Sequence, residues 1–216
     1  MDVQTMFDIF TAYGFESDDV LTDTRKLEAL NETYWDASGR EMWPFLEATA
    51  SYTFAGGSAT PVTPVTDIST VEAIYRTTDG KRLEPWRRDD FFQTYAANLT
   101  QAGSPSLYYF EANSLKFYPV PNASDAVVVK YTRVPPALQQ TTLEAAVVFP
   151  PKFHRSVLVM GTLSRLALAQ DDVDMSNAYE RLYEKALAFM VADQLDQQSD
   201  RTDFIHVNDP DNWDYS

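Results

Sequence analysis

Helical periodicity occurs near both ends of this chain, and a long region with the pattern of β-strands separates the two blocks. Apolar side chains recur every three or four positions in residues 3–13 and 22–37, and again in 151–170 and 176–195. The region 50–138 begins with an alternating stretch rich in Thr, Gly and Pro and continues as short strand patterns between turns. Because each amphipathic helix must bury its apolar stripe against another element, the two blocks are expected to pack together.

These patterns predict an α+β, mainly α fold. The N- and C-terminal helices are expected to close into one helical bundle that carries a central inserted β-sheet and hairpin subdomain, followed by an extended C-terminal arm. The expected parts are the N-terminal helices (1–49), the β-rich insert (50–138), the C-terminal helix pair (139–196) and the extended arm (197–216).

Local signals indicate where the helices begin and end. Asp2 stands where the first helix needs an N-cap, and the second helix is expected to start near Thr22 and to stop at Gly39. Ser176 is expected to cap the last helix, with Asp174 favouring its positive end. The helix boundaries are therefore specified mainly by short polar side chains and one glycine.

Turn signals divide the insert into strands. Asp79-Gly80 predicts a tight turn, and a hairpin is expected around Ala112-Asn113. The stretch "DAVVVKYTRVP" is expected to be the third strand beside that hairpin, and the Pro-Pro pair that follows ends the sheet because proline lacks a backbone N–H.

Composition excludes several classes of protein. The chain has 216 residues, of which 44% are hydrophobic, with 13 Phe, 12 Tyr and 4 Trp, so it can fold around an ordinary core. Its formal net charge of −15 repels DNA phosphates and anionic membranes at long range. The same acidity is also typical of plain solubility or of a source that lives in high salt. Without cysteine the chain has no disulfide and no thiolate site.

The sequence also indicates no targeting signal. The segment "MDVQTMFDIFTAYGF" lacks the basic and long apolar regions of a signal peptide, so none is expected. No run approaches the roughly 18 apolar residues of a membrane span. We therefore expect no membrane partner.

The sequence offers no constellation for catalysis, cofactor binding or metal binding. The two histidines, His154 and His206, have no Cys, His or carboxylate at metal-ligand spacing, and ordinary packing or surface roles are expected for them. Neither a G-x-S-x-G elbow nor a phosphate-binding glycine loop occurs. The sequence thus predicts a protein that is not an enzyme, with no catalytic residue, cofactor or metal.

The acidic joint before the last helix resembles the start of a calcium loop only in its spacing. Counted from Asp172, Asn177 stands where such a loop needs glycine, and Tyr183 stands where it needs a bidentate Glu. The joint is therefore expected to be an interhelix turn.

The first helix of the C-terminal pair is apolar around most of its circumference, which indicates burial on several sides. Two interpretations remain open, a central helix within one chain and a helix that also faces another subunit. The residues expected in this core or subunit interface are Phe153, Val157, Met160, Leu163 and Ala167.

The last twenty residues combine many acids with spaced large apolar side chains. Disordered tails are usually poorer in such side chains, so an arm that orders against a partner is expected, with a floppy or self-packed terminus as the alternative. The anchors of this arm are expected to be Phe204, Ile205, Val207, Trp213 and Tyr215.

Four stretches together resemble the head-to-tail adaptor (connector) proteins of tailed bacteriophages, a group that includes tail tubular and portal-attached ring proteins. "TRKLEALNETYWDAS", with Leu30-Asn31-Glu32, is similar to the second helix of the family, and "EMWPF" is similar to the Pro-containing exit that follows it. "NSLKFYPVPNASDAVVVKYTRVPPAL" is similar to its hairpin, and "FPPKFHRSVLVMGTLSRLALAQDDVDMSNAYERLYEKAL" to its closing helix pair.

The resemblance implies a structural virion protein at the neck, assembled in the host cytoplasm. Family members form a dodecameric ring under the portal protein, extend the DNA channel and present a docking face to the next neck or tail protein. C-terminal segments grip the portal, which gives the predicted arm its partner. Double-stranded DNA is expected to pass without specific binding, because a negative channel wall does not attract it.

Three other functions remain as alternatives. The chain is compatible with a distal neck or tail-completion protein, which is still structural. A carbohydrate-binding β-sandwich module would instead use an exposed tryptophan such as Trp86 to stack on sugar rings. A hydrolase would need a partner carboxylate for Asp89 or Asp90 at glycosidase separation, and nothing in the sequence indicates one.

Overall fold

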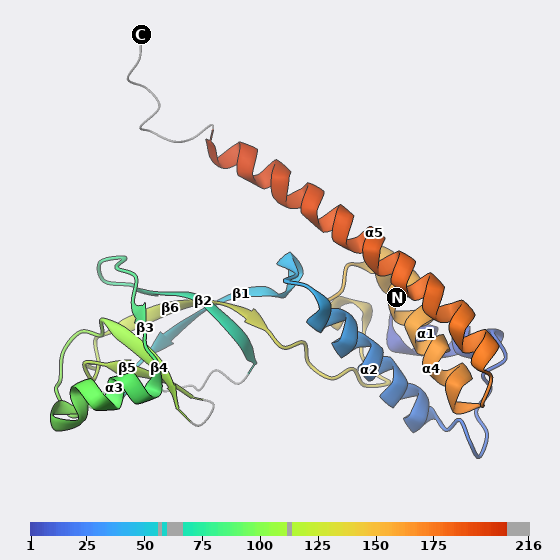
Figure 1. Ribbon diagram of the computed structural model, residues 1–216, viewed down its shortest axis with the longest axis horizontal. Coiled ribbons are helices and arrows are strands. Elements are labelled where there is room, and N and C mark those ends of the chain that lie inside the picture. Colours follow the sequence, from blue (N-terminus) through green and yellow to red (C-terminus); the bar gives the residue numbers. More distant parts are fainter. Residues whose placement is uncertain (56–57, 60–66, 112–113, 207–216) are drawn as a thin grey trace, which may run out of the picture. The chain divides into compact units, whose positions relative to one another are not determined.

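The computed structural model describes residues 1–55, 58–59, 67–111 and 114–206 (Figure 1). The architecture is mixed α/β, with helices and two small sheets, as expected for an α+β protein. Two compact units are present. Unit 1 combines Met1–Phe45 with Pro135–Ser216, and unit 2 is formed by Leu46–Val134.

Unit 1 is built from helices at both ends of the chain. Its α-helices are α1 (Val3–Ala12), α2 (Asp23–Arg40), α4 (Met160–Ala169) and α5 (Val173–His206). Short 3-10 turns η1 (Pro44–Leu46, at the border with unit 2), η3 (Glu144–Ala146) and η4 (Pro151–Phe153) connect them, and a π-helical segment, η5 (His154–Val159), leads into α4. The segment η5 contacts α1, α2 and α5, and α4 packs on α2 and α5.

Two of the expected helix starts are confirmed. The Asp2 carboxylate accepts a hydrogen bond from the Thr5 backbone N–H at 2.8 Å, and the Thr22 hydroxyl accepts one from Arg25 N–H at 3.3 Å. The stop predicted at Gly39 is wrong by one residue, since α2 runs through Gly39 to Arg40.

The predicted cap of the last helix is wrong. Helix α5 begins at Val173, and the Asp172 carboxylate accepts a hydrogen bond from the Met175 N–H at 2.9 Å. Ser176 therefore lies inside the helix, where its N–H donates to the Asp172 carbonyl at 3.0 Å. Asp172 acts as the N-cap because its short carboxylate can reach the free N–H groups of the first turn.

The extended conformation predicted for residues 197–216 is also wrong for residues 197–206, because these residues are helical. Helix α5 continues through this segment and is 34 residues long, or about 50 Å at the usual rise. The segment "DQQSDRTDFIH" contains neither Pro nor Gly, so nothing interrupts the backbone ladder. Loss of apolar periodicity therefore does not mark the end of the helix here. Residues 207–216 lie outside the described residues.

The described residues of unit 2 form two three-stranded sheets and one short α-helix. The first sheet has the order β1 (Glu47–Thr53), β6 (Ala126–Arg133), β2 (Ile68–Arg76), and both pairs are antiparallel. The second has the order β3 (Glu84–Pro85), β4 (Leu107–Glu111), β5 (Ser114–Tyr118). Helix α3 (Arg88–Tyr95) and the turn η2 (Ala96–Asn98) lie between β3 and β4 in the chain.

The turn predicted at Asp79-Gly80 is confirmed. Gly80 has a φ of +67°, and Arg76 N–H donates to the Lys81 carbonyl at 2.9 Å across the turn. Strands β4 and β5 pair as the expected hairpin, with Leu107 opposite Tyr118, while Ala112-Asn113 themselves lie outside the described residues.

The expectation that 125–134 extends this hairpin is wrong. Strand β6 pairs with β1 and β2 instead of β5. Pro119 and Pro121 follow β5 directly and supply no N–H, so they end the ladder and the chain crosses to the other sheet. There β6 buries its apolar side chains in a core formed by Phe54, Ile74, Leu83, Tyr108, Leu115, Phe117, Val127, Val129 and Tyr131.

Candidate assembly surfaces

The closing helix pair is held inside unit 1. Phe153, Val157, Leu163 and Ala167 are buried and Met160 is half-buried, all within a single chain. Residues of α1, α2 and α5 share this core. These five side chains therefore take part in the core of unit 1.

Helices α2, α4 and α5 pack tightly around Gly161. A Cβ atom at this position would lie 2.5 Å from Thr33 Cγ2 on α2 and 2.9 Å from Tyr183 Cδ2 on α5. Both distances are shorter than carbon atoms tolerate, so the packing of the three helices requires glycine here.

A charged cluster joins the same three helices. The Tyr183 hydroxyl of α5 donates to Asp36 Oδ2 of α2 at 2.7 Å, and Arg40 and Arg165 approach that oxygen at 3.1 and 3.7 Å. Partial burial acts to raise the pKa of Asp36, but hydrogen bonds from Arg40 and Tyr183 outweigh it and lower the pKa. Burial, with the hydrogen bond to Asp36 second, raises the pKa of Tyr183 well above its usual range. The cluster is therefore a fixed Asp⁻–Tyr–Arg⁺ arrangement at neutral pH.

A stripe of exposed apolar side chains runs along one flank of α5. Met175, Leu182 and Phe189 are 40%, 51% and 66% exposed and are spaced by seven residues. Leu182 is thus exposed, whereas Tyr183 and Met190 on the same helix are buried. The heptad spacing of the three residues was the signal that sequence reasoning missed.

Helix α2 presents a different exposed face. Glu28, Glu32 and Trp35 follow one another at helical spacing and are all exposed. Trp35 is 46% exposed, and its Nε1–H donates to the Pro135 carbonyl at 3.3 Å. The indole is thus held in place with part of its ring in solvent.

The two histidines have ordinary roles as far as the structure describes them. His154 is buried, and its Nε2–H donates to the Phe149 carbonyl at 2.7 Å, while Nδ1 lies 3.1 Å from both the amino nitrogen and the carbonyl oxygen of Met1. Burial, and secondarily the charge of that amino group, lower the pKa of His154 below its usual value. His206 ends α5, and its side chain lies outside the description.

We expect the stability of the protein to fall as the pH drops below about 6.5 because of His154. Since its pKa is lower in the folded chain than in the unfolded one, the unfolded chain takes up the proton first. The slope cannot exceed about 1.4 kcal/mol per pH unit for one group. Urea unfolding of the wild type and His154→Gln at pH 7.5, 6.5 and 5.5 checks this. Equal slopes for both proteins would contradict it.

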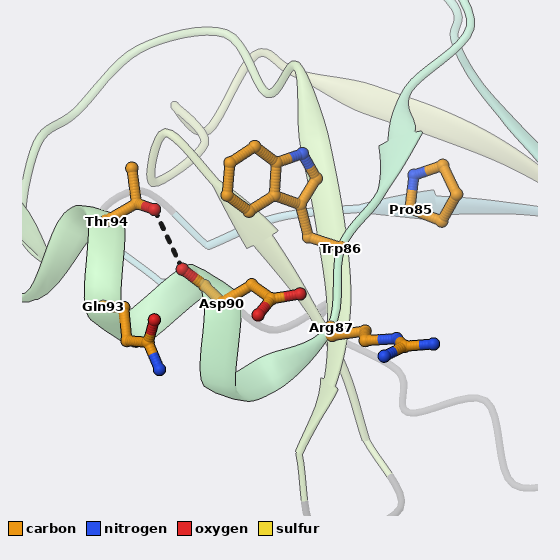
Figure 2. A pocket seen from close by; sticks show the side chains of 6 residues that line it. All are labelled: Pro85, Trp86, Arg87, Asp90, Gln93 and Thr94. Carbon is orange, nitrogen blue, oxygen red and sulfur yellow. Dashed lines mark hydrogen bonds between the residues drawn. The ribbon is translucent and has the colours of Figure 1, made fainter.

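A shallow pocket of about 510 Å³ lies on unit 2 beside α3 (Figure 2). It is lined by Pro85, Trp86, Arg87, Asp90, Gln93 and Thr94. Trp86 packs on Tyr95 with ring centroids 5.5 Å apart, and the Thr94 hydroxyl donates to the Asp90 carbonyl at 2.9 Å. Asp90 is the sole acid among these lining residues, so the pocket does not assemble the carboxylate pair that a glycosidase needs.

The predicted arm is described only in part. The backbone of Phe204 and Ile205 belongs to α5, while Val207, Trp213 and Tyr215 lie outside the described residues. Within the described ranges, no group of three or more His, Asp or Glu side chains is arranged to hold a metal ion. None of the described helices is both long enough and apolar enough to cross a membrane.

The folded chain is a helical unit interrupted by a β unit. Its sequence matches the family model described as SU10 adaptor protein over residues 4–206. The chain therefore belongs to the SU10 adaptor protein family, a family of phage head-to-tail adaptors. A comparison with curated proteins found no significant match.

Membership gives the protein its general role. The family is a structural one rather than a class of enzymes, and it places the chain in a bacteriophage virion. An adaptor of this kind associates with portal and tail proteins. The resemblance found in the sequence is thus confirmed.

Proposed function

We propose that the protein forms a dodecameric ring under the portal, extends the DNA channel, and offers its other side to the tail or neck. The observation that carries this proposal is the family match, because it spans both units and nearly all of the described chain. A helical unit formed from both chain ends, with an inserted β unit, gives each subunit two separate bodies for contacts with different neighbours.

The portal contact is assigned to the C-terminal arm. This arm comprises the end of α5 with Phe204 and Ile205, and the following segment with Val207, Trp213 and Tyr215. Large apolar anchors among acids are typical of segments that order on a partner. Trp and Tyr in particular are frequent among the residues that carry binding energy at interfaces.

The acidity of the chain fits passage of DNA through the ring. A formal charge of −15 for each copy gives the assembly a strongly negative field. Phosphates of a passing genome are repelled by such a field, so DNA slides without specific binding.

Mass photometry of the protein mixed with the portal protein from the same phage tests the proposal. We expect the portal to gain about twelve copies of the 24.5 kDa chain. Deletion of 207–216 is expected to abolish this gain, since it removes three of the five anchors. A matched control replaces only the acids Asp209, Asp211 and Asp214 with Asn and should still bind.

Two outcomes would contradict parts of the proposal. A portal with unchanged mass would favour a distal neck or tail-completion protein. A truncated chain that adds as much mass as the full chain would remove the arm from the portal contact while leaving the adaptor role in place.

A further inference from the structure

The exposed stripe on α5 points away from α2. Glu184 of α5 pairs with Arg40 of α2 at 3.3 Å, so this side of α5 faces α2. Leu182 is two positions earlier and therefore about 200° around the helix axis. The stripe of Met175, Leu182 and Phe189 thus lies on the far flank of α5, about 21 Å long at 1.5 Å per residue.

Burial within the chain does not account for this stripe. Single exposed apolar residues are normal, but three large ones at heptad spacing form the continuous seam that packs against another helix. Phe189 is partly held already, because its ring meets the buried Phe153 edge-on at 6.2 Å. Arg181 and Lys185 are exposed next to the stripe and form no ion pair within the described part of the chain.

The exposed face of α2 complements the stripe in shape and charge. Glu28 and Glu32 carry negative charge on this face, and Glu32 also pairs with Arg165 of its own chain at 3.7 Å. Trp35, fixed by its hydrogen bond to Pro135, gives the face a rigid aromatic anchor. At the other end, Arg25 donates to the Val20 carbonyl at 3.4 Å and brings the exposed Val20 beside α2. An apolar residue at each end with acids between them matches an apolar stripe bordered by two cations.

We propose that the α5 stripe of one copy packs on the exposed α2 face of the next copy. This inference rests on the proposed ring. The two surfaces belong to different helices and point in different directions, so the contact is head-to-tail, and head-to-tail contacts generate closed rings when the rotation closes. Arg181 and Lys185 then lie opposite Glu28 and Glu32 of the neighbour.

Cross-linking between engineered thiols tests the contact. The chain has no cysteine, so a Leu182→Cys/Glu32→Cys protein carries one thiol on each proposed surface and no other. A flexible bis-maleimide reagent tolerates the unknown register. We expect a ladder of products at multiples of 24.5 kDa with the double variant, both on the portal and in the concentrated free protein, and no ladder with either single variant.

A matched control moves the thiol of the α5 stripe from position 182 to a position outside both surfaces. Leu143 is 70% exposed and lies outside both surfaces, so Leu143→Cys/Glu32→Cys should give at least about tenfold less ladder. A ladder no stronger than this control would overturn the inference. Efficient dimers from Leu182→Cys alone would also overturn it, since they would show two α5 helices meeting about a two-fold axis.

Portal mass separates this inference from the proposed function. A portal that gains mass without a cross-linked ladder would leave the adaptor role intact and refute the α5–α2 contact. A ladder without portal binding would support the α5–α2 contact and contradict the adaptor role. Met175→Glu/Phe189→Glu should also reduce the ladder at least about tenfold in the Leu182→Cys/Glu32→Cys background, whereas Leu143→Glu should not. Met175, Phe189 and Leu143 are all exposed, so melting curves should show these variants folded.

Discussion

Replacement of Gly161 by Ala is expected to lower the free energy of unfolding by about 1–3 kcal/mol, because the added methyl group collides with two neighbouring helices. The nearest atoms are Thr33 Cγ2 at 2.5 Å and Tyr183 Cδ2 at 2.9 Å. Both belong to buried side chains in a packed core, so neither has free space to move into. Urea unfolding followed by circular dichroism measures the loss.

Gly39 provides the matched control, since it is also helical but a Cβ there would have no atom within 4 Å. Gly39→Ala should raise stability by about 0.5–1 kcal/mol, because alanine loses less backbone entropy on folding. Adding Thr33→Ser to Gly161→Ala removes the nearest methyl and keeps the hydroxyl that donates to the Ala29 carbonyl at 2.9 Å. This second change should recover part of the loss. Equal effects of the two Gly→Ala changes would contradict the packing argument.

Asn31→Ala is expected to cost about 2–4 kcal/mol, because it leaves buried backbone groups without partners. The Asn31 side-chain amide donates to the Leu27 and Leu138 carbonyls, both at 3.0 Å, and its Oδ1 accepts from the Leu138 N–H at 2.7 Å. A single side chain thus satisfies both backbone groups of Leu138.

The control for this change is Asn177→Ala, which removes an exposed Asn from α5 and should alter stability by less than about 0.5 kcal/mol. Parallel urea titrations of the two variants measure the difference. If Asn31→Ala and Asn177→Ala unfold at the same urea concentration, the hydrogen bonds to Leu138 contribute nothing net. Asn31 belongs to the Leu-Asn-Glu motif of the sequence, and this contact gives that motif a structural explanation.

Local signals in the sequence predicted local structure well. Asp2 and Gly80 act within a few residues of themselves, so their roles as helix cap and turn residue follow from short-range sterics and hydrogen bonding alone. The order of helices and strands was likewise readable from periodicity. The N-cap of α5 was predicted wrongly, because Asp172 and Ser176 are both suitable capping residues and the sequence alone does not show which of them caps the helix.

Contacts between distant segments were not predictable in the same way. Asn31 meets a residue 107 positions later in the chain, and β6 chooses β1 and β2 over its nearer neighbour β5. Such long-range pairings depend on which apolar faces can be buried together, and a single sequence does not show this. The exposed stripe on α5 was missed because hydrophobicity alone does not distinguish Leu182 from the buried Met190.

The pairing of β1 with β6 also affects how the gene can change. Glu47 lies opposite Thr132, so the strands by which the chain enters and leaves unit 2 run side by side at its border. The two ends of the insert are therefore only about 5 Å apart, a gap that a short turn can bridge. Recombination between phage genomes can then exchange or remove this β unit as a single cassette, while the helices that flank it keep their own core.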